Sequence, residues 1–92
     1  MIKSFKHKGL KIFFTTGSTA GINPNHATRL EDRLQALHTA MSIEDMDIPG
    51  WKLHPLKVDH AGLWAVTISG NWRMVFQFKD GHAHVVNYED YH

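Results

Sequence analysis

LWAVTISGNWRMVFQFK, residues 63–79, decides the fold because it predicts a β-hairpin. Apolar side chains recur at every second position in both halves, the spacing of a strand with one buried face. Gly70 and Asn71 separate the two halves and supply a tight turn. The side chains predicted to face the core are Trp64, Val66 and Ile68 in the first strand and Trp72, Met74, Phe76 and Phe78 in the second.

One further strand is expected on each side of this hairpin. Asp80 and Gly81 predict a second tight turn, which leads into a last strand over residues 82–88. Before the hairpin, residues 52–56 are expected to form a short edge strand, because Pro55 cannot donate to a sheet ladder. The C-terminal half is therefore expected to be a mostly antiparallel sheet.

The N-terminal half predicts two helices after an extended lead-in or short first strand at residues 2–4. In the first helix, Leu10, Phe13 and Phe14 share one face, and Gly17 stands where a left-handed terminator belongs. The second helix has Asn23 as N-cap and Pro24 at its first position. Its predicted apolar stripe consists of Ala27, Leu30, Leu34, Leu37 and Met41.

These elements give the order β-α-α-β-β-β-β in a single domain, residues 1–92. We expect an α+β fold in which two N-terminal helices pack on one face of a twisted sheet and leave the other face partly open. This open face is expected to carry a polar and cationic row that could hold an RNA strand, although it would equally suit an ordinary half-buried sheet. The row consists of Arg73, Val75, Gln77 and Lys79.

Composition narrows the class of protein. The 92 residues include no cysteine, which excludes disulfides and thiolate zinc sites, and so short a chain is not expected to enclose a large cofactor. The start of the chain lacks the apolar run of a signal peptide, and no run of about 18 apolar residues occurs. We expect a soluble cytoplasmic protein with no cofactor and no membrane contact.

The net charge of +1 hides a gradient along the chain. Residues 1–40 hold six Lys and Arg against two acids, whereas residues 41–92 hold four against seven. The basic cluster near the start could meet phosphates or could simply be a solvated surface. Its members are Lys3, Lys6, Lys8 and Lys11.

Several side chains late in the sequence suit metal-independent RNA cleavage. Attack by the RNA's own 2′-hydroxyl needs a base, a cation for the transition-state phosphate and an acid for the leaving 5′-oxygen. Histidine can be either acid or base, arginine can hold phosphate through two hydrogen bonds, and tyrosine can stack on a base. The candidates are His54, Lys57, Arg73, Asp90, Tyr91 and His92.

Each candidate also has an ordinary structural explanation. His54 could cap a turn beside Pro55, Arg73 could pair with Asp90, and the end of the chain could be frayed. His82 and His84 form an H-x-H pair on one face of a strand, but without a third ligand at a defined spacing we expect no metal site.

Four segments together resemble HigB-like toxins of the RelE superfamily. They are MIKSF at residues 1–5, KLHPLK at 52–57, NWRMVFQF at 71–78 and YEDYH at 88–92. The resemblance spans essentially the whole chain. It implies a RelE-like fold and a ribosome-dependent endoribonuclease that cleaves mRNA in the ribosomal A site. It also implies a HigA-type antitoxin as partner, with operator DNA bound only through that antitoxin.

Site residues carried over by this resemblance are His54, Arg73, Asp90, Tyr91 and His92, with Lys57 as a phosphate contact. The expected roles are transition-state stabilisation for Arg73 and proton transfer for His54 and His92. Tyr91 would stack on a base or transfer a proton, and Asp90 would orient a partner or act as acid or base. A basic first helix, with Lys6, Lys8 and Lys11, would contact ribosomal RNA.

Two alternatives remain open from the sequence. A non-catalytic RNA-binding or ribosome-binding module would use the same basic surface without needing both His54 and His92. An obligate interaction subunit of a repressor complex would explain the small size, but the chain shows no helix-turn-helix pattern.

Overall fold

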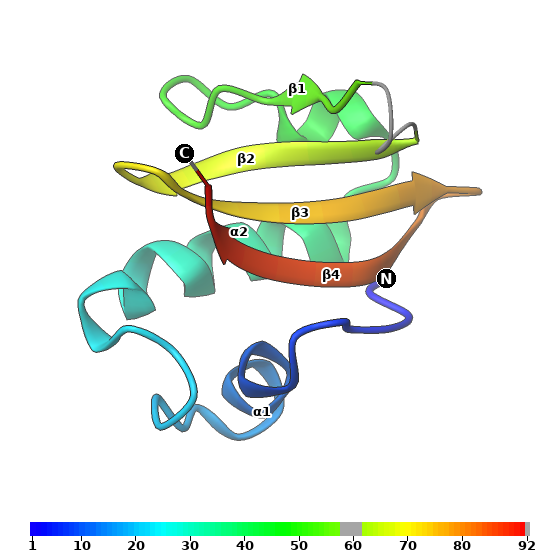
Figure 1. Cartoon of the computed structure of the whole chain (residues 1–92). Helices are drawn as coiled ribbons and strands as arrows, with labels where there is room; N and C mark the ends of the chain where they lie inside the picture. Colours follow the sequence, from blue (N-terminus) through cyan, green and yellow to red (C-terminus); the bar gives the residue numbers. More distant parts are fainter. Residues whose placement is uncertain (58–61, 92) are drawn as a thin grey trace.

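A four-stranded antiparallel sheet is covered on one side by helices (Figure 1). The computed structural model describes residues 1–57 and 62–91. The strands lie in the order β1-β2-β3-β4, so every neighbour in the sheet is also a neighbour in the chain. The expected α+β class is confirmed. The elements are α1 (Lys8–Thr16), η1 (Pro24–His26), α2 (Ala27–Thr39), η2 (Ile43–Met46), β1 (His54–Pro55), β2 (Leu63–Ser69), β3 (Trp72–Lys79) and β4 (His82–Asp90).

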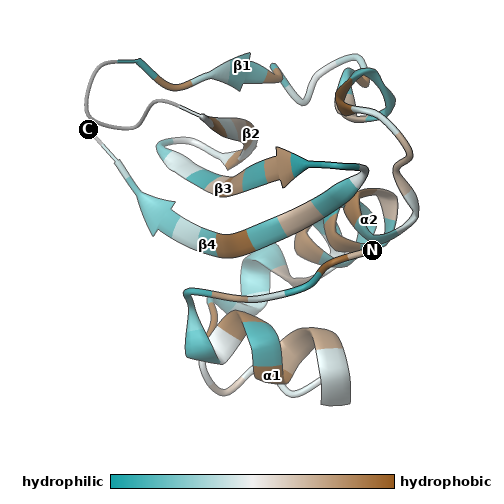
Figure 2. Cartoon of the chain, turned by 90° about the vertical axis from the view of Figure 1, so that its right-hand side faces the viewer, coloured by the Kyte–Doolittle hydropathy of each residue, from teal (hydrophilic) through white to brown (hydrophobic). Residues whose placement is uncertain are grey.

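The N-terminal segment runs beside β4 without forming a regular strand. Two isolated parallel bridges join Ile2 to Ala83 and Phe5 to Val86. The segment is thus an extended lead-in, and the first β of the expected order is reduced to these bridges, because α1 begins soon afterwards, at Lys8. Figure 2 shows this segment between β4 and α1.

Local chemistry explains both ends of α1 and the start of the segment that leads into α2. His7 Nδ1 accepts a hydrogen bond from the Leu10 N–H at 2.9 Å and so caps α1. At its other end Gly17 adopts φ 82°, the left-handed conformation predicted for it. Asn23 caps as expected, but the cap and Pro24 open the 3-10 turn η1, which continues into α2.

The stripe predicted for α2 is correct up to Leu37 and wrong at Met41. The helix ends at Thr39, and Ala40 is extended, so Met41 leaves the stripe and is 83% exposed. Leu30, Leu34 and Leu37 are buried. They pack in one core cluster with side chains from α1 and from the sheet, and each fully buried leucine contributes about 1.5–3 kcal/mol. The fully buried partners include Leu10, Val66, Met74, Phe76 and Val86.

One irregularity in β4 sets the pairing of the last two strands. Lys79 pairs with His82 next to the turn, but beyond Phe76 the register shifts by one, so that Val75 pairs with Asn87. Val85 and Val86 therefore stand opposite a single residue of β3, which is the arrangement of a β-bulge. The bulge turns Val86 into the core and leaves Val85 43% exposed on the other face.

The face away from the helices is less polar than predicted. Arg73, Gln77 and Lys79 are on it, but Val75 is only 4% exposed and belongs to a buried surface. Leu63 and Val85 line the same hollow as Val75 and help to cover it. None of the helices in residues 1–57 and 62–91 is long and apolar enough to cross a membrane.

Candidate active site

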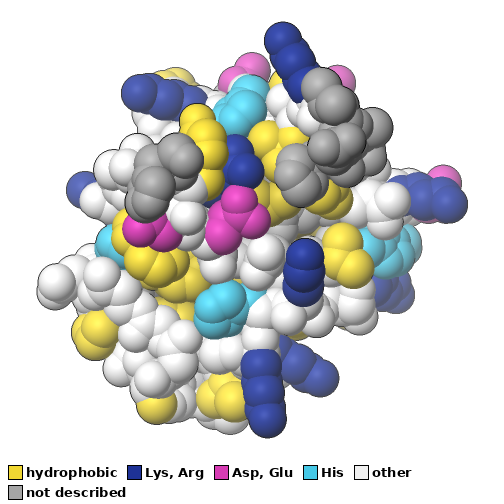
Figure 3. Space-filling model, viewed as in Figure 1, with side chains coloured by type: hydrophobic (Ala, Val, Ile, Leu, Met, Phe, Trp, Pro, Cys, Tyr) yellow, Lys and Arg dark blue, Asp and Glu magenta, His cyan; other side chains and the backbone are white. Residues whose placement is uncertain are grey.

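The candidate site lies on this open face, near the turn between β2 and β3. His54 begins β1, Arg73 is the second residue of β3, and Tyr91 follows β4 directly. These side chains line one hollow of about 270 Å³, which brings together residues far apart in the sequence. Figure 3 shows this face, where hydrophobic side chains surround basic and acidic ones. The other lining residues are Lys52, Thr67, Gly70, Asn71 and Trp72.

Arg73 is the most constrained cation of the site. Its Nε and Nη2 donate hydrogen bonds to Glu89 Oε2 at 3.1 and 2.8 Å, and its side chain is only 12% exposed. The Tyr91 ring covers the guanidinium at 3.9 Å, a cation–π contact. Both bonds to Glu89 use one edge of the guanidinium, so another edge stays oriented for a phosphate. The ion pair of Arg73 is thus with Glu89, where the ordinary structural explanation had named Asp90.

Glu89 belongs to the candidate site, although the sequence alone did not indicate it. It is the direct cross-strand partner of Arg73, and its Oε1 accepts a hydrogen bond from Asn87 Nδ2 at 3.3 Å. A hairpin without the bulge would have placed Tyr88 opposite Arg73. The sequence does contain two adjacent acids, Glu89 and Asp90, in its terminal motif. Alternation alone does not indicate which of them lies on the same face as Arg73.

His54 is held in an orientation that defines its tautomer. Its Nδ1 lies 2.8 Å from the Lys52 carbonyl oxygen. Since a carbonyl oxygen only accepts, Nδ1 carries the proton in the neutral ring, and Nε2 is left as a proton acceptor. Lys52 itself has a φ of 54°, a left-handed conformation that directs its carbonyl toward His54.

Tyr91 is fastened to the hairpin turn through its backbone. Its N–H donates to the Asn71 carbonyl oxygen at 2.9 Å, while the ring is 52% exposed. The exposed ring face is available for a base to stack on, because the other face covers Arg73. The start of the Tyr-His ending is therefore ordered, and the frayed-tail alternative fails at this residue.

The remaining predicted residues are placed differently. Asp90 ends β4 and Lys57 follows β1; both are exposed, and neither lines the hollow of His54 and Arg73. His92 lies outside the described residues. Lys6 borders a second hollow that also contains Arg73, whereas Lys8 and Lys11 are exposed on α1.

A buried polar cluster supports β3 and β4 from beneath. His26 Nδ1 is hydrogen-bonded to the Tyr88 hydroxyl, and Trp72, next to Arg73, stacks on the Tyr88 ring at 4.7 Å. Burial lowers the pKa of His26, assisted by the charge of Arg29, and burial raises the pKa of Tyr88. The phenol therefore donates to a neutral imidazole, and the pair fixes the base of the site.

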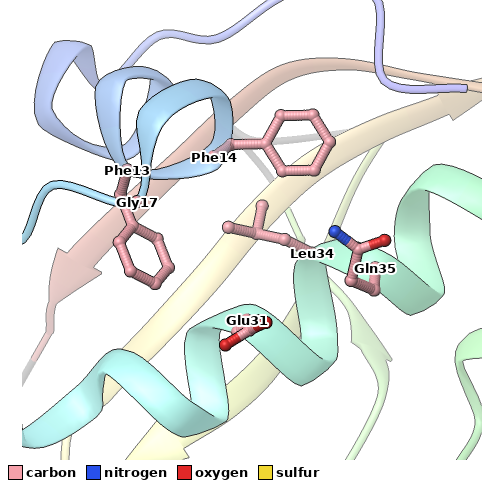
Figure 4. Close-up of a pocket in the computed structure, with 6 residues that line it drawn as sticks. All are labelled: Phe13, Phe14, Gly17, Glu31, Leu34 and Gln35. Atoms are coloured by element: carbon pink, nitrogen blue, oxygen red, sulfur yellow. The ribbon is translucent and has the colours of Figure 1, made fainter.

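Another hollow, of about 200 Å³, lies between the two helices (Figure 4). Phe13, Phe14 and Leu34 supply apolar walls, and Glu31 is the one titratable side chain among its described lining. This composition offers no cation for a phosphate, so the hollow does not suit RNA cleavage.

The two histidines considered for a metal have another environment. His82 Nδ1 lies 3.3 Å from the N-terminal amine of Met1. Residues 1–57 and 62–91 contain no group of three or more His, Cys, Asp or Glu side chains placed to hold a metal ion.

Comparison with known proteins places this geometry in a family. Residues 3–92 match the HigB-like toxin family, described as the RelE-like toxin of the type II toxin-antitoxin system HigB. The chain is 52% identical over 92 residues to the Endoribonuclease HigB of Proteus vulgaris, covering 100% of both chains.

Solved structures agree on the fold alone. The crystal structure of YafQ from E. coli strain BL21(DE3) superposes with a TM-score of 0.52 at 14% identity, covering 97% of this chain and 92% of that one. The crystal structure of a YafQ mutant from E. coli gives a TM-score of 0.53 at 14% identity with the same coverage. With a family match over nearly every residue and a half-identical relative of equal length, the chain belongs to the HigB-like toxins of type II toxin-antitoxin systems.

Proposed function

We propose that this toxin is an endoribonuclease that cleaves mRNA in the A site of the ribosome and thereby inhibits translation. The observation that carries the proposal is the Arg73 guanidinium, oriented by Glu89 and covered by Tyr91 in a hollow shared with His54. The name of the Proteus vulgaris relative supports the same activity.

Cleavage proceeds by attack of the 2′-oxygen on the adjacent phosphorus. His54 Nε2 takes the 2′-hydroxyl proton, the new O–P bond closes a 2′,3′-cyclic phosphate, and the bond to the 5′-oxygen breaks. The leaving 5′-oxygen takes a proton from an acid, the role assigned to His92. Arg73 stabilises the charge that builds on the non-bridging oxygens.

This chemistry draws on side chains alone. Tyr91 stacks on a base beside the cleaved bond or transfers a proton, Asp90 orients a partner or acts as acid or base, and Lys57 binds the backbone phosphate. Because an imidazole pair and a guanidinium supply base, acid and charge stabilisation, the mechanism is proposed to be metal-independent.

The partners follow from the family and from charge. An antitoxin of the HigA type inhibits the toxin and carries any operator binding, and the toxin acts in the cytoplasm, where ribosomes are found. The exposed lysines Lys6, Lys8 and Lys11 bind ribosomal RNA through its phosphates.

Primer-extension mapping of a defined mRNA on purified bacterial ribosomes tests the proposal. The wild type is expected to give discrete cuts that require ribosomes, and Arg73→Ala and His92→Ala are expected to abolish them. Ribosome binding without any cut would instead identify a non-catalytic ribosome-binding module.

A further inference from the structure

A second hollow borders Arg73 in the direction of Val75, away from the β2–β3 turn. It measures about 230 Å³, and Arg73 is the one residue that it shares, among the described residues, with the hollow of His54 and Tyr91. Its walls are the apolar side chains Leu56, Leu63, Val75 and Val85. A strand of RNA whose phosphate rests on Arg73 would thus have a hollow on either side of that phosphate.

Val85 lines this second hollow from a strained backbone conformation. It has a φ of 49°, which is rare for any residue with a side chain and an outlier for a β-branched one. The bulge nevertheless presents this valine 43% exposed, at the edge of a hollow next to Arg73. Strained positions of this kind persist where neighbours enforce them and cluster at functional sites.

Ser4 enforces the bulge from the N-terminal segment. Its Oγ accepts from the Val85 N–H at 2.9 Å, and its carbonyl oxygen accepts from the Val86 N–H at 3.1 Å. The next residue, Phe5, bridges to Val86. The exposed valine is therefore held in place by a dedicated support rather than left loose on the surface.

Asn87 supplies the polar recognition group of this hollow. Its Nδ2 donates to Glu89 Oε1 at 3.3 Å, which fixes the orientation of the amide. Asn87 Oδ1 and the second N–H of the amide are left for a ligand, since no other hydrogen bond of this side chain occurs within the described residues. An acceptor beside a donor matches the edge of a nucleobase.

We propose that this hollow is a nucleobase subsite, a statement that rests on the proposed endoribonuclease function. The nucleotide next to the phosphate on Arg73 places its base between Val75 and Val85, and Asn87 hydrogen-bonds to the edge of that base. Apolar walls suit the flat face of any base, whereas the amide discriminates between bases. Lys6, at the rim, is placed to meet the following phosphate.

Replacing Val85 by glycine separates this function from folding. Val85→Gly removes the wall and relieves the positive φ, so the melting temperature is expected to stay within a few degrees of wild type. The rate of mRNA cleavage is expected to fall by about tenfold, the range of one lost base contact. Asp80→Gly is the matched control, since Asp80 has a φ of 54° at the β3–β4 turn, and cleavage is expected to be unchanged.

An abasic nucleotide shows whether the loss acts through a base. One abasic position is placed on either side of the cleaved bond in a defined mRNA on ribosomes. At one of these positions the missing base is expected to slow the wild type to the rate that Val85→Gly shows on intact RNA. The same abasic position is expected to slow Val85→Gly no further. If Val85→Gly were slower than the wild type by the same factor on abasic RNA as on intact RNA, the subsite assignment would be overturned.

Three further outcomes decide the assignment. Asn87→Ala is expected to change which base is preferred at that position, and an unchanged preference would remove the role of Asn87. If Val85→Gly cleaved normally but resisted the antitoxin, the hollow would be a protein-docking surface and the proposal wrong. If the wild type cut no more RNA than Arg73→Ala does, the proposed function would be overturned, and the subsite with it.

Discussion

Arg73 and Glu89 face each other across β3 and β4, and one oxygen of Glu89 accepts hydrogen bonds from both Nε and Nη2 of Arg73. This carboxylate also repels a phosphate, so its presence beside the cation proposed to stabilise the transition state implies that orientation matters more than added attraction. Glu89→Ala is expected to lower kcat about tenfold without raising KM, because a misplaced guanidinium loses transition-state contact while substrate repulsion falls.

Glu89→Gln is the conservative comparison in the same kinetic assay. Its amide oxygen still accepts from Arg73, so most of the lost kcat is expected to return. An equal loss in the alanine and glutamine variants would show that the negative charge of Glu89, and not its hydrogen bonding, serves catalysis.

The stability of the fold is expected to decrease as the pH falls from 7.5 to 5. Burial depresses the pKa of His26, so between its folded value and the ordinary value of about 6.5 the unfolded state binds a proton that the folded state does not. Stability is therefore fully present above about pH 6.5 and is lost below it. Urea unfolding at the two pH values measures the change.

His26→Asn isolates that contribution from the other histidines. The variant is expected to be less stable at pH 7.5, because Tyr88 loses its buried acceptor, and to depend less on pH. A pH dependence as steep as that of the wild type would assign the effect to other groups.

Gly9→Ala is expected to destabilise the fold by at least about 2 kcal/mol. A Cβ at Gly9 would lie 2.8 Å from the Gly21 carbonyl carbon and 2.9 Å from its Cα, and backbone atoms cannot move aside as a side chain would. Lys11→Ala, an exposed change in the same helix, is the control and is expected to alter stability by less than about 0.5 kcal/mol. Thermal melting of Gly9→Ala near the wild-type value would show that α1 and the 17–23 loop can separate freely.

Charge reversal on α1 is expected to weaken ribosome binding. Lys8→Glu together with Lys11→Glu removes two exposed cations. Binding to phosphates weakens when cations are lost and when salt is added. Co-sedimentation with ribosomes at low salt is the measurement. Unchanged co-sedimentation would show that another surface makes the contact.

Much of the fold could be predicted because its signals are local. Alternation over residues 63–79 defines the hairpin, and Gly17 ends α1 through a conformation that glycine adopts freely. Arg33 shows the limit: a helical pattern gives it a polar position, yet it is buried. Its Nε donates to the Thr67 carbonyl oxygen at 2.8 Å, and its guanidinium covers the Trp51 ring at 4.7 Å. Those partners are distant in sequence, so no local pattern indicates them.

The sequence indicated which side chains to consider for the candidate site more than how they are arranged. His54, Arg73 and Tyr91 do line one hollow. Glu89 could not be chosen over Asp90, because pairing beyond Phe76 depends on an extra residue in β4 that hydrophobic alternation does not reveal.

That extra residue is an insertion that β4 absorbs at a single point. Because Val85 and Val86 together stand opposite Phe76, deleting either of them would leave a regular hairpin in which Val75 still pairs with Asn87 and Arg73 with Glu89. Tyr88 would remain on the buried face, and the exposed valine beside the second hollow would be lost. The side chain that borders this hollow is therefore separable from the arginine and its carboxylate partner, and a toxin one residue shorter here would keep the pair without the wall.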